Sequence, residues 1–165
     1  MQPVEPKRRR LLLILGLVCA AAVVMMLAVL FGRPETAAFT PPPFDPAAQS
    51  GAPQELPGTL AYSTLDAQAY TLAVCAAPVV QENSVQLWFT NPAQNSVWLK
   101  VRVYTADGAL LGESGLLKPG EYVQAVALDP VPAQSTPIVL KVMAYEPDTY
   151  HSAGAVTLNT TLLLP

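Results

Sequence analysis

Residues able to do chemistry are scarce in this chain of 165 residues. It has one histidine, His151, and two cysteines, Cys19 and Cys75. A serine hydrolase needs a serine, a histidine and a carboxylate in contact, and Asp148 is close to His151 in the sequence. However, the chain has no Gly-x-Ser-x-Gly motif, which presents the nucleophile in one large class of hydrolases. We therefore expect no catalytic site.

Metal and cofactor sites need several ligands that converge. The sequence has no Cys-x-x-Cys pair, no second histidine and no Asp-rich calcium loop. Glu146 and Asp148 flank Pro147 and could offer oxygen ligands to a cation, but a solvated acidic turn explains them better. The sequence has no glycine-rich phosphate loop either. We expect no bound metal and no cofactor.

A surface that could bind a partner is easier to find. In residues 96–104 apolar side chains alternate with a second set, namely Trp98, Lys100, Arg102 and Tyr104. In a strand the second set shares one face, and an outward aromatic ring beside cations can anchor a protein or a glycan. The alternative is a tryptophan that is buried or that shields a sheet edge beneath lysine and arginine stems. Trp88, in another alternating run, is expected to point outward in the same way.

The segment 145–151 is a second candidate contact region. Its candidate residues are Tyr145, Tyr150 and His151. It falls between the last two expected strands, and loops at the ends of β-sandwiches carry recognition in many folds. The alternative is an ordinary connection that only joins two strands.

The elements that must position these residues are strands. From residue 59 onward no apolar period of 3.6 residues persists, whereas short alternating runs recur between turn residues. The expected strands are residues 70–74, 84–90, 96–104, 110–113, 122–128, 138–145 and 155–164. About seven strands in about one hundred residues is the count of an immunoglobulin-like β-sandwich. We predict an all-β fold for residues 59–165, preceded by one N-terminal transmembrane helix.

Residues 11–31 form an apolar run without any charged, amide or hydroxyl side chain. As a helix this run would be about 31 Å long, close to the hydrocarbon thickness of a bilayer. Basic residues at positions 7–10 precede it, so the positive-inside rule keeps the tail, residues 1–10, in the cytoplasm. We predict a single-pass signal anchor at the cell membrane. It would contact the lipid bilayer through residues 11–31 and export the C-terminal domain.

Other interpretations of this region are weaker. A cleaved signal peptide has a shorter apolar core, and the best cleavage motif here, at residues 36–38, lies beyond Arg33. A lipid-modified cysteine needs a small residue immediately before it, whereas Val18 precedes Cys19. The basic residues could bind nucleic acid or anionic lipid, but their position next to the apolar run favours a role in topology.

Residues 32–58 are expected to form a proline-rich linker. Seven prolines occur in residues 33–58, three of them consecutive at residues 41–43. Such a sequence buries too little apolar surface to offset the entropy of ordering, so we expect an extended stalk that reaches on the order of 80 Å. The Pro-Pro-Pro-Phe string at residues 41–44 could dock on an aromatic groove, but a plain spacer is favoured.

Beyond residue 31 the chain has eleven acidic and five basic residues, a net charge of −6. This balance does not suit a nucleic-acid partner. Cys75 is the one cysteine in that part of the sequence, so no disulfide can form within it. Because Cys75 follows the apolar residues 72–74, a buried unreactive thiol is favoured over a bridge between two chains.

A family resemblance rests on two strings, NPAQNSVWLKVRVYTADGALLGESGLLKPGEYVQAVAL (residues 91–128) and VLKVMAYEP (residues 139–147). Together they resemble the small single-pass membrane proteins of Gram-positive anaerobic bacteria that carry one exported immunoglobulin-like or fibronectin-type-III-like domain. The most specific parts are the Asn-Pro-x-x-Asn loop, the Asp107-Gly108 hairpin and the turn at residues 118–120. These are scaffold features. The resemblance therefore implies a fold and a location, and it supplies no catalytic residue.

These observations predict a non-catalytic, membrane-anchored, extracytoplasmic binding module of the bacterial cell envelope. Its expected partner is an envelope protein or a cell-wall component, and no nucleic acid is expected. The alternative is a structural subunit of a membrane-embedded secretion, conjugation or division complex, in which the span itself carries part of the assembly.

Overall fold

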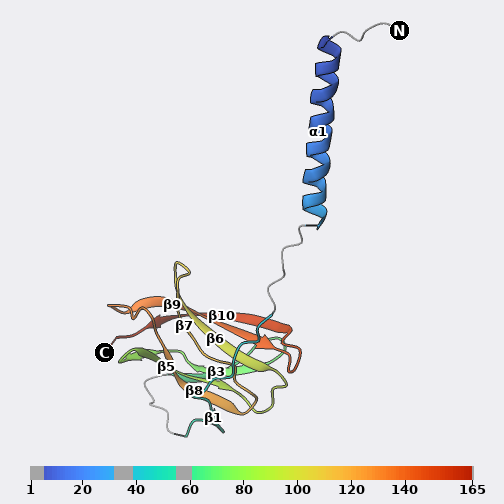
Figure 1. Ribbon diagram of the computed structural model, residues 1–165. Coiled ribbons are helices and arrows are strands. Elements are labelled where there is room, and N and C mark those ends of the chain that lie inside the picture. Colours follow the sequence, from blue (N-terminus) through green and yellow to red (C-terminus); the bar gives the residue numbers. More distant parts are fainter. Residues whose placement is uncertain (1–5, 32–38, 55–60, 165) are drawn as a thin grey trace. The chain divides into compact units, whose positions relative to one another are not determined.

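The computed structural model describes residues 6–31, 39–54 and 61–164 (Figure 1). The chain divides into two units, residues 1–40 and residues 41–165. The first unit contains one helix, α1 (Pro6–Phe31), which includes the whole apolar run predicted from the sequence. Side chains of α1 are described at positions 10, 11 and 13–27. Among the described residues, no helix is both long enough and apolar enough to cross a membrane.

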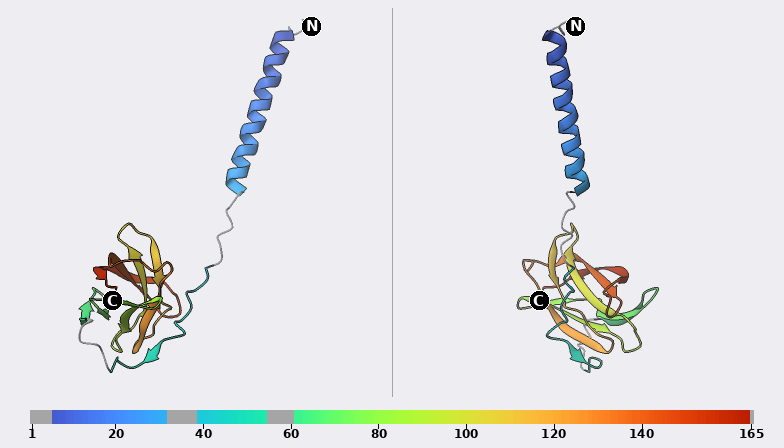
Figure 2. Two further views of the ribbon diagram at one scale, coloured as in Figure 1. Left: turned by 90° about the vertical axis from the view of Figure 1, so that its left-hand side faces the viewer. Right: turned by 45° about the vertical axis from the view of Figure 1, so that its right-hand side comes forward.

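The second unit is an all-β sandwich of two antiparallel sheets (Figure 2). The larger sheet has the strand order β1 (Gln49–Ser50), β8 (Glu121–Ala127), β5 (Ser84–Asn91), β3 (Thr71–Cys75) and β2 (Tyr62–Asp66), and β4 (Val79–Gln81) also pairs with β5. The smaller sheet has the order β10 (Ser152–Leu162), β9 (Thr136–Tyr145), β6 (Trp98–Thr105) and β7 (Leu110–Glu113). All seven strands predicted from the sequence are present, and β1, β2 and β4 are additional.

Alternation along β6 builds the core between the two sheets. Leu99, Val101 and Val103 are completely buried, and they share one apolar cluster with Leu87 and Phe89 of β5. The expected buried face of this strand is therefore confirmed. Burial of a side chain of this size contributes about 1.5–3 kcal/mol, so the cluster is the main source of stability for the sandwich.

The hairpins use the turn residues that the sequence indicates. Gly108 in the β6–β7 connection and Gly120 before β8 have positive φ angles of 92° and 80°, which only glycine adopts at little cost. The predicted turns at residues 107–108 and 118–120 are therefore confirmed.

The segment 41–54 belongs to the second unit, in contrast to the linker predicted for residues 32–58 and the domain start predicted at residue 59. The backbone N–H of Leu116 donates to Pro43, and the N–H of Asp45 donates to the carbonyl of Leu116, at 2.9 and 3.0 Å. Farther along, β1 pairs with β8. These sheet-like bonds offset the ordering entropy that we expected to keep the segment extended. The other parts of the predicted linker, residues 32–38 and 55–58, lie outside the described residues.

Gly115 allows this docking. A Cβ atom built on Gly115 would come within 2.4 Å of the Asp45 backbone, closer than real Cβ contacts. The close approach also lets the Gly115 N–H donate to the Asp45 carboxylate at 2.7 Å, while Asp45 accepts a second bond from the N–H of Ala47. The hydrogen bonds of Asp45 therefore hold this segment against the sandwich.

We expect Gly115→Ala to release residues 41–54 from the sandwich. The added methyl group meets backbone atoms of Asp45, which cannot move without breaking the hydrogen bonds of that residue. The expected loss in the free energy of unfolding is about 1–3 kcal/mol. Limited proteolysis should then cleave within 41–54, and the melting temperature should fall. Gly16→Ala is the matched control, because nothing lies within 4 Å of the Cβ position there. Unchanged protease resistance in Gly115→Ala would contradict this account of the segment.

Candidate functional site

Three aromatic rings meet on the outer face of the four-stranded sheet. The ring centroid of Trp98 lies 4.8 Å from that of Phe44 and 5.1 Å from that of Tyr150, both in edge-to-face geometry. Such pairs contribute about 0.5–1.5 kcal/mol each beyond the area they bury. The Nζ atom of Lys118 lies 4.7 Å from the centroid of Phe44. Phe44, Trp98 and Tyr150 are called the aromatic cluster below.

The local backbone structure sets the position of each ring. Trp98 begins β6 and points away from the core because its neighbours Val97 and Leu99 are buried. Phe44 lies between the two backbone bonds of the segment that docks on Leu116. The cluster therefore joins strand β6 to a part of the chain that the sequence assigned to the linker.

Tyr150 is held in a strained turn. Its φ is 57°, and a bulky residue seldom adopts a positive φ, at a cost on the order of 1–3 kcal/mol. The turn is closed by its own bonds, since the N–H of Tyr150 donates to Glu146 at 3.0 Å and the N–H of Glu146 donates to His151 at 2.8 Å. Strain of this kind is common at functional sites.

The two contact regions predicted from the sequence form one surface. Trp98 of β6 contacts Tyr150 of the β9–β10 loop, and it pairs in register with Tyr145 at the end of β9. The Tyr145 hydroxyl donates to the sulfur of Met143 at 3.7 Å, which keeps it on the sheet. His151 is exposed beside Tyr150 in the same loop. Phe44 and Lys118 were not predicted to belong to this surface. The one signal in the sequence was the Pro-Pro-Pro-Phe string, which suggested docking on an aromatic groove.

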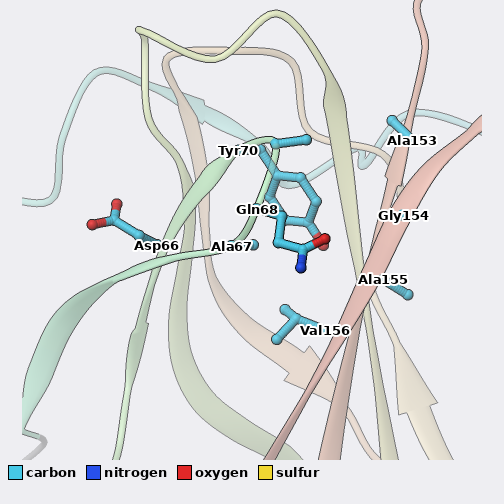
Figure 3. Close-up of a pocket in the computed structure, with 9 residues that line it drawn as sticks. Asp66, Ala67, Gln68, Tyr70, Ala153, Gly154, Ala155 and Val156 are labelled. Atoms are coloured by element: carbon cyan, nitrogen blue, oxygen red, sulfur yellow. The ribbon is translucent and has the colours of Figure 1, made fainter.

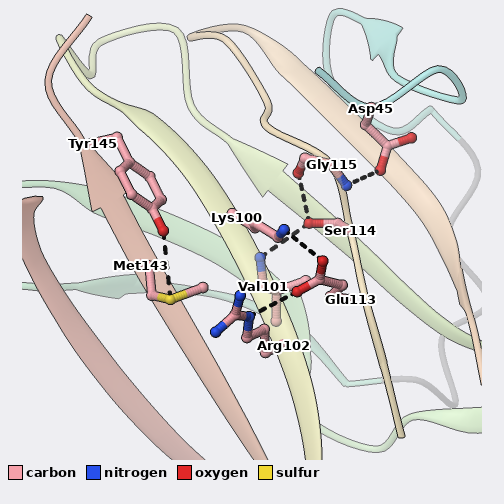
Figure 4. A network of polar contacts seen from close by, with 9 residues as sticks. All are labelled: Asp45, Lys100, Val101, Arg102, Glu113, Ser114, Gly115, Met143 and Tyr145. Atoms are coloured by element: carbon pink, nitrogen blue, oxygen red, sulfur yellow. Dashed lines mark hydrogen bonds and ion pairs between the residues drawn. The ribbon is translucent and has the colours of Figure 1, made fainter. Parts of the chain in front are cut away.

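Beside the aromatic cluster, the outer face of β6 carries an ion network (Figure 4). Lys100 Nζ lies 2.8 Å from Glu113 Oε1, and Arg102 Nε lies 2.7 Å from Glu113 Oε2. Lys100 is only 4% exposed, although its position on the outer face is as predicted. It is therefore a structural residue here, and it does not offer the partner contact that the sequence suggested. Tyr104, at the other end of the strand, is half-buried.

The network sets the protonation of its members. Burial opposes ionisation of Glu113, but the hydrogen bonds from Lys100 and Arg102 outweigh it and lower the pKa of Glu113. The hydrogen bond to Glu113 raises the pKa of Arg102. Because the folded pKa of Glu113 lies below the unfolded value, its contribution to stability is present above the unfolded pKa. That contribution is lost as the pH falls through the folded value.

We expect Glu113→Gln to destabilise the sandwich by about 1–2 kcal/mol near pH 7, because the buried Lys100 loses its charged partner. Denaturant unfolding should show this difference shrinking as the pH falls through the folded pKa of Glu113, because a protonated Glu113 resembles glutamine. In the matched double variant Lys100→Met/Glu113→Gln no charge is left buried, so most of the loss should disappear. A Glu113→Gln penalty that does not change with pH would contradict this role.

Trp88 lies on the other sheet, away from the aromatic cluster. It occupies a β-bulge in β5, where the register with β8 shifts between Gln86 and Phe89, and its φ is 49°. Its ring stacks on Tyr122 of β8 with centroids 6.0 Å apart. Leu87 and Phe89 on either side are buried, so Trp88 points outward as predicted. The two tryptophans therefore belong to separate surfaces.

A hollow of about 340 Å³ opens where β10 passes the start of β3 (Figure 3). Tyr70 and Gln68 line one side and Gly154 and Val156 the other. Among the described side chains, the Tyr70 hydroxyl is a buried group without a hydrogen-bond partner. Burial raises its pKa. The hydroxyl can therefore donate to water or to a small acceptor in this hollow.

Other groups of the sandwich that could react are buried or hydrogen-bonded. Cys75 is completely buried as predicted, and burial raises the pKa of its thiol to about 11, so it is not a nucleophile near neutral pH. In the β9–β10 loop the Thr149 hydroxyl donates to Glu146 and accepts from the N–H of His151, both at 3.3 Å. Within the described part of the chain, no group of three histidine, cysteine or acidic residues could hold a metal ion.

Comparison with models of known protein families, with curated proteins and with solved structures found no significant match.

Proposed function

We propose that this chain is a non-catalytic binding module of the cell envelope, anchored in the membrane by its N-terminal segment. The anchor is supported by the uncharged sequence of residues 11–31, all of which lies in α1, and by the basic residues at positions 7–10. The tail would lie in the cytoplasm, and the β-sandwich would lie outside the cell.

We infer further that the sandwich is immunoglobulin-like, and its strand order supports this. In immunoglobulin notation, β10, β9, β6 and β7 correspond to G, F, C and C′, and β8, β5 and β3 correspond to E, B and A. The strand β2 extends the larger sheet beyond the strand that corresponds to A. Domains of this architecture often act as recognition modules, with specificity supplied by side chains and loops at one end.

The aromatic cluster is the observation that carries the binding proposal. Phe44 remains 37% exposed, and Trp98 and Tyr150 are half-buried, so the rings are fixed yet still accessible. Rigid aromatic residues bind at low entropic cost, and cations beside them add polar contacts. Lys118, whose Nζ lies over the Phe44 ring, supplies such a cation. The partner would be an envelope protein or a cell-wall component that presents an apolar face with acceptor groups.

We expect Trp98→Ala to reduce capture of the partner at least tenfold, since a central aromatic anchor commonly accounts for such a loss. The full chain in detergent would be immobilised and exposed to envelope extract and to cell-wall fragments separately. Trp88→Ala is the matched control, because that ring also points outward and contacts another aromatic ring but lies on the other sheet. Circular dichroism would check that both variants fold. Equal losses in the two variants, or no saturable capture by the unaltered chain, would contradict the proposed surface.

The orientation can be tested separately by labelling with a membrane-impermeant thiol reagent. In a Cys19→Ala background, Gln94→Cys places a reactive thiol in an exposed loop of the sandwich, whereas Cys75 is buried. We expect labelling in intact cells that carry the chain. Gln2→Cys, in the N-terminal tail, should be labelled only after lysis. Labelling of Gln94→Cys only after lysis would contradict export of the sandwich.

A further inference from the structure

The hollow where β10 passes the start of β3 has the features of a ligand site. Its volume, about 340 Å³, falls within the range of about 300–1,000 Å³ that is usual for small-molecule pockets. The loop between β2 and β3 lines one side, and the first half of β10 lines the other (Figure 3). No residue of the aromatic cluster belongs to this lining. Binding in the hollow would therefore be independent of the cluster.

Tyr70 is the polar residue of the hollow that needs a partner. It is only 7% exposed, and its hydroxyl has no hydrogen-bond partner among the described residues. A buried polar group without a partner lowers stability, so each such group in a native protein calls for an explanation. Burial raises the pKa of Tyr70, which keeps the hydroxyl protonated near neutral pH. The hydroxyl is therefore available as a hydrogen-bond donor.

The backbone of β10 leaves the space beside the Tyr70 ring unfilled. The register of β10 is irregular between Ser152 and Gly154, and irregularities of this kind are frequent next to binding sites. A Cβ atom at Gly154 would lie 4.0 Å from the Cε1 atom of Tyr70, in contact with the ring. Because Gly154 has no side chain, this part of the strand does not cover the ring.

The hollow offers no charge to a ligand. Asp66 is the one charged residue among those that line it. Its carboxylate points away from Tyr70 in Figure 3, and it accepts a hydrogen bond from the Thr71 hydroxyl at 3.2 Å. A charged ligand would lose its hydration here without gaining an ion pair, so a neutral ligand suits the hollow better.

The other lining groups are apolar side chains and one amide. Val156 and Ala67 pack against the core but remain partly exposed. Gln68 is exposed, and its side chain lies across the end of the Tyr70 ring in Figure 3. An exposed side chain can turn aside at low cost, which would open the buried hydroxyl to a ligand. The best ligand would then combine a small apolar group, an acceptor for Tyr70 and a donor for the Gln68 Oε1 atom.

We propose that this hollow binds the N-acetyl group of an N-acetylated sugar. The carbonyl oxygen of the group would accept from the Tyr70 hydroxyl, its N–H would donate to Gln68, and its methyl group would contact Val156. The group is neutral and supplies all three contacts with few atoms. The choice of a sugar as its carrier rests on the proposed function, because N-acetylated sugars are building blocks of bacterial cell-wall glycans.

Titration of the full chain in detergent with N-acetylglucosamine, followed by NMR, tests the site. We expect saturable shifts of the backbone N–H signals of Gln68, Tyr70 and Gly154. Glucose should bind at least tenfold more weakly, because it lacks both the carbonyl acceptor and the methyl group. A peptide with acetylated lysine presents the same group on a protein. No shifts at these residues, equal binding of glucose, or tighter binding of the peptide than of the sugar would overturn the proposal.

Tyr70→Phe removes only the hydroxyl and separates a binding role from a structural one. We expect the dissociation constant for N-acetylglucosamine to rise about three- to tenfold. The melting temperature without the sugar should not fall, because the hydroxyl has no partner to lose. Tyr62→Phe is the matched control, since its hydroxyl donates to Thr90 at 2.7 Å and burial also raises its pKa. That variant should melt at a lower temperature and bind the sugar unchanged. A lower melting temperature of Tyr70→Phe with unchanged sugar binding would overturn the proposal.

Trp98→Ala distinguishes this site from the aromatic cluster. The variant should lose capture of the partner, as expected for the proposed function, and should keep its affinity for N-acetylglucosamine, because Trp98 does not line the hollow. Sugar binding that weakens in Trp98→Ala but not in Tyr70→Phe would assign the sugar to the cluster and overturn the proposal.

Discussion

Burial of one face of β6 is the constraint on which the rest of the sandwich depends. Val101 and Val103 can leave water only if the sheet containing β5 covers them, because a single sheet cannot bury its own face. Since side chains alternate along a strand, fixing that face inward also fixes Trp98 and Lys100 outward. The outer surface proposed for binding is therefore a consequence of the core.

The residues that cover the outer face of β6 come from distant parts of the chain. Glu113 of β7 pairs with Lys100, Phe44 reaches Trp98 from the segment before the first strands, and Tyr150 reaches it from the β9–β10 loop. The close approach at Gly115 makes the Phe44 contact possible. As a result, a segment rich in proline helps to build the surface instead of acting only as a spacer.

The aromatic cluster suits recognition of another molecule, because its rings are held in place by contacts with one another and remain partly exposed. The Lys118 ammonium over the Phe44 ring adds a cation to this surface.

Alternation and turn residues by themselves determined the seven principal strands, the buried face of residues 97–103 and the turns at Gly108 and Gly120, because these depend on neighbours within a few residues. Only the tertiary structure decided that Phe44 belongs to the surface, that Lys100 is buried, and that Trp88 and Trp98 lie on different sheets. These outcomes depend on contacts between segments far apart in the chain. Composition makes residues 41–54 resemble a spacer. The hydrogen bonds that order them come from residues about seventy positions away, as in the bond from the Gly115 N–H to the Asp45 carboxylate.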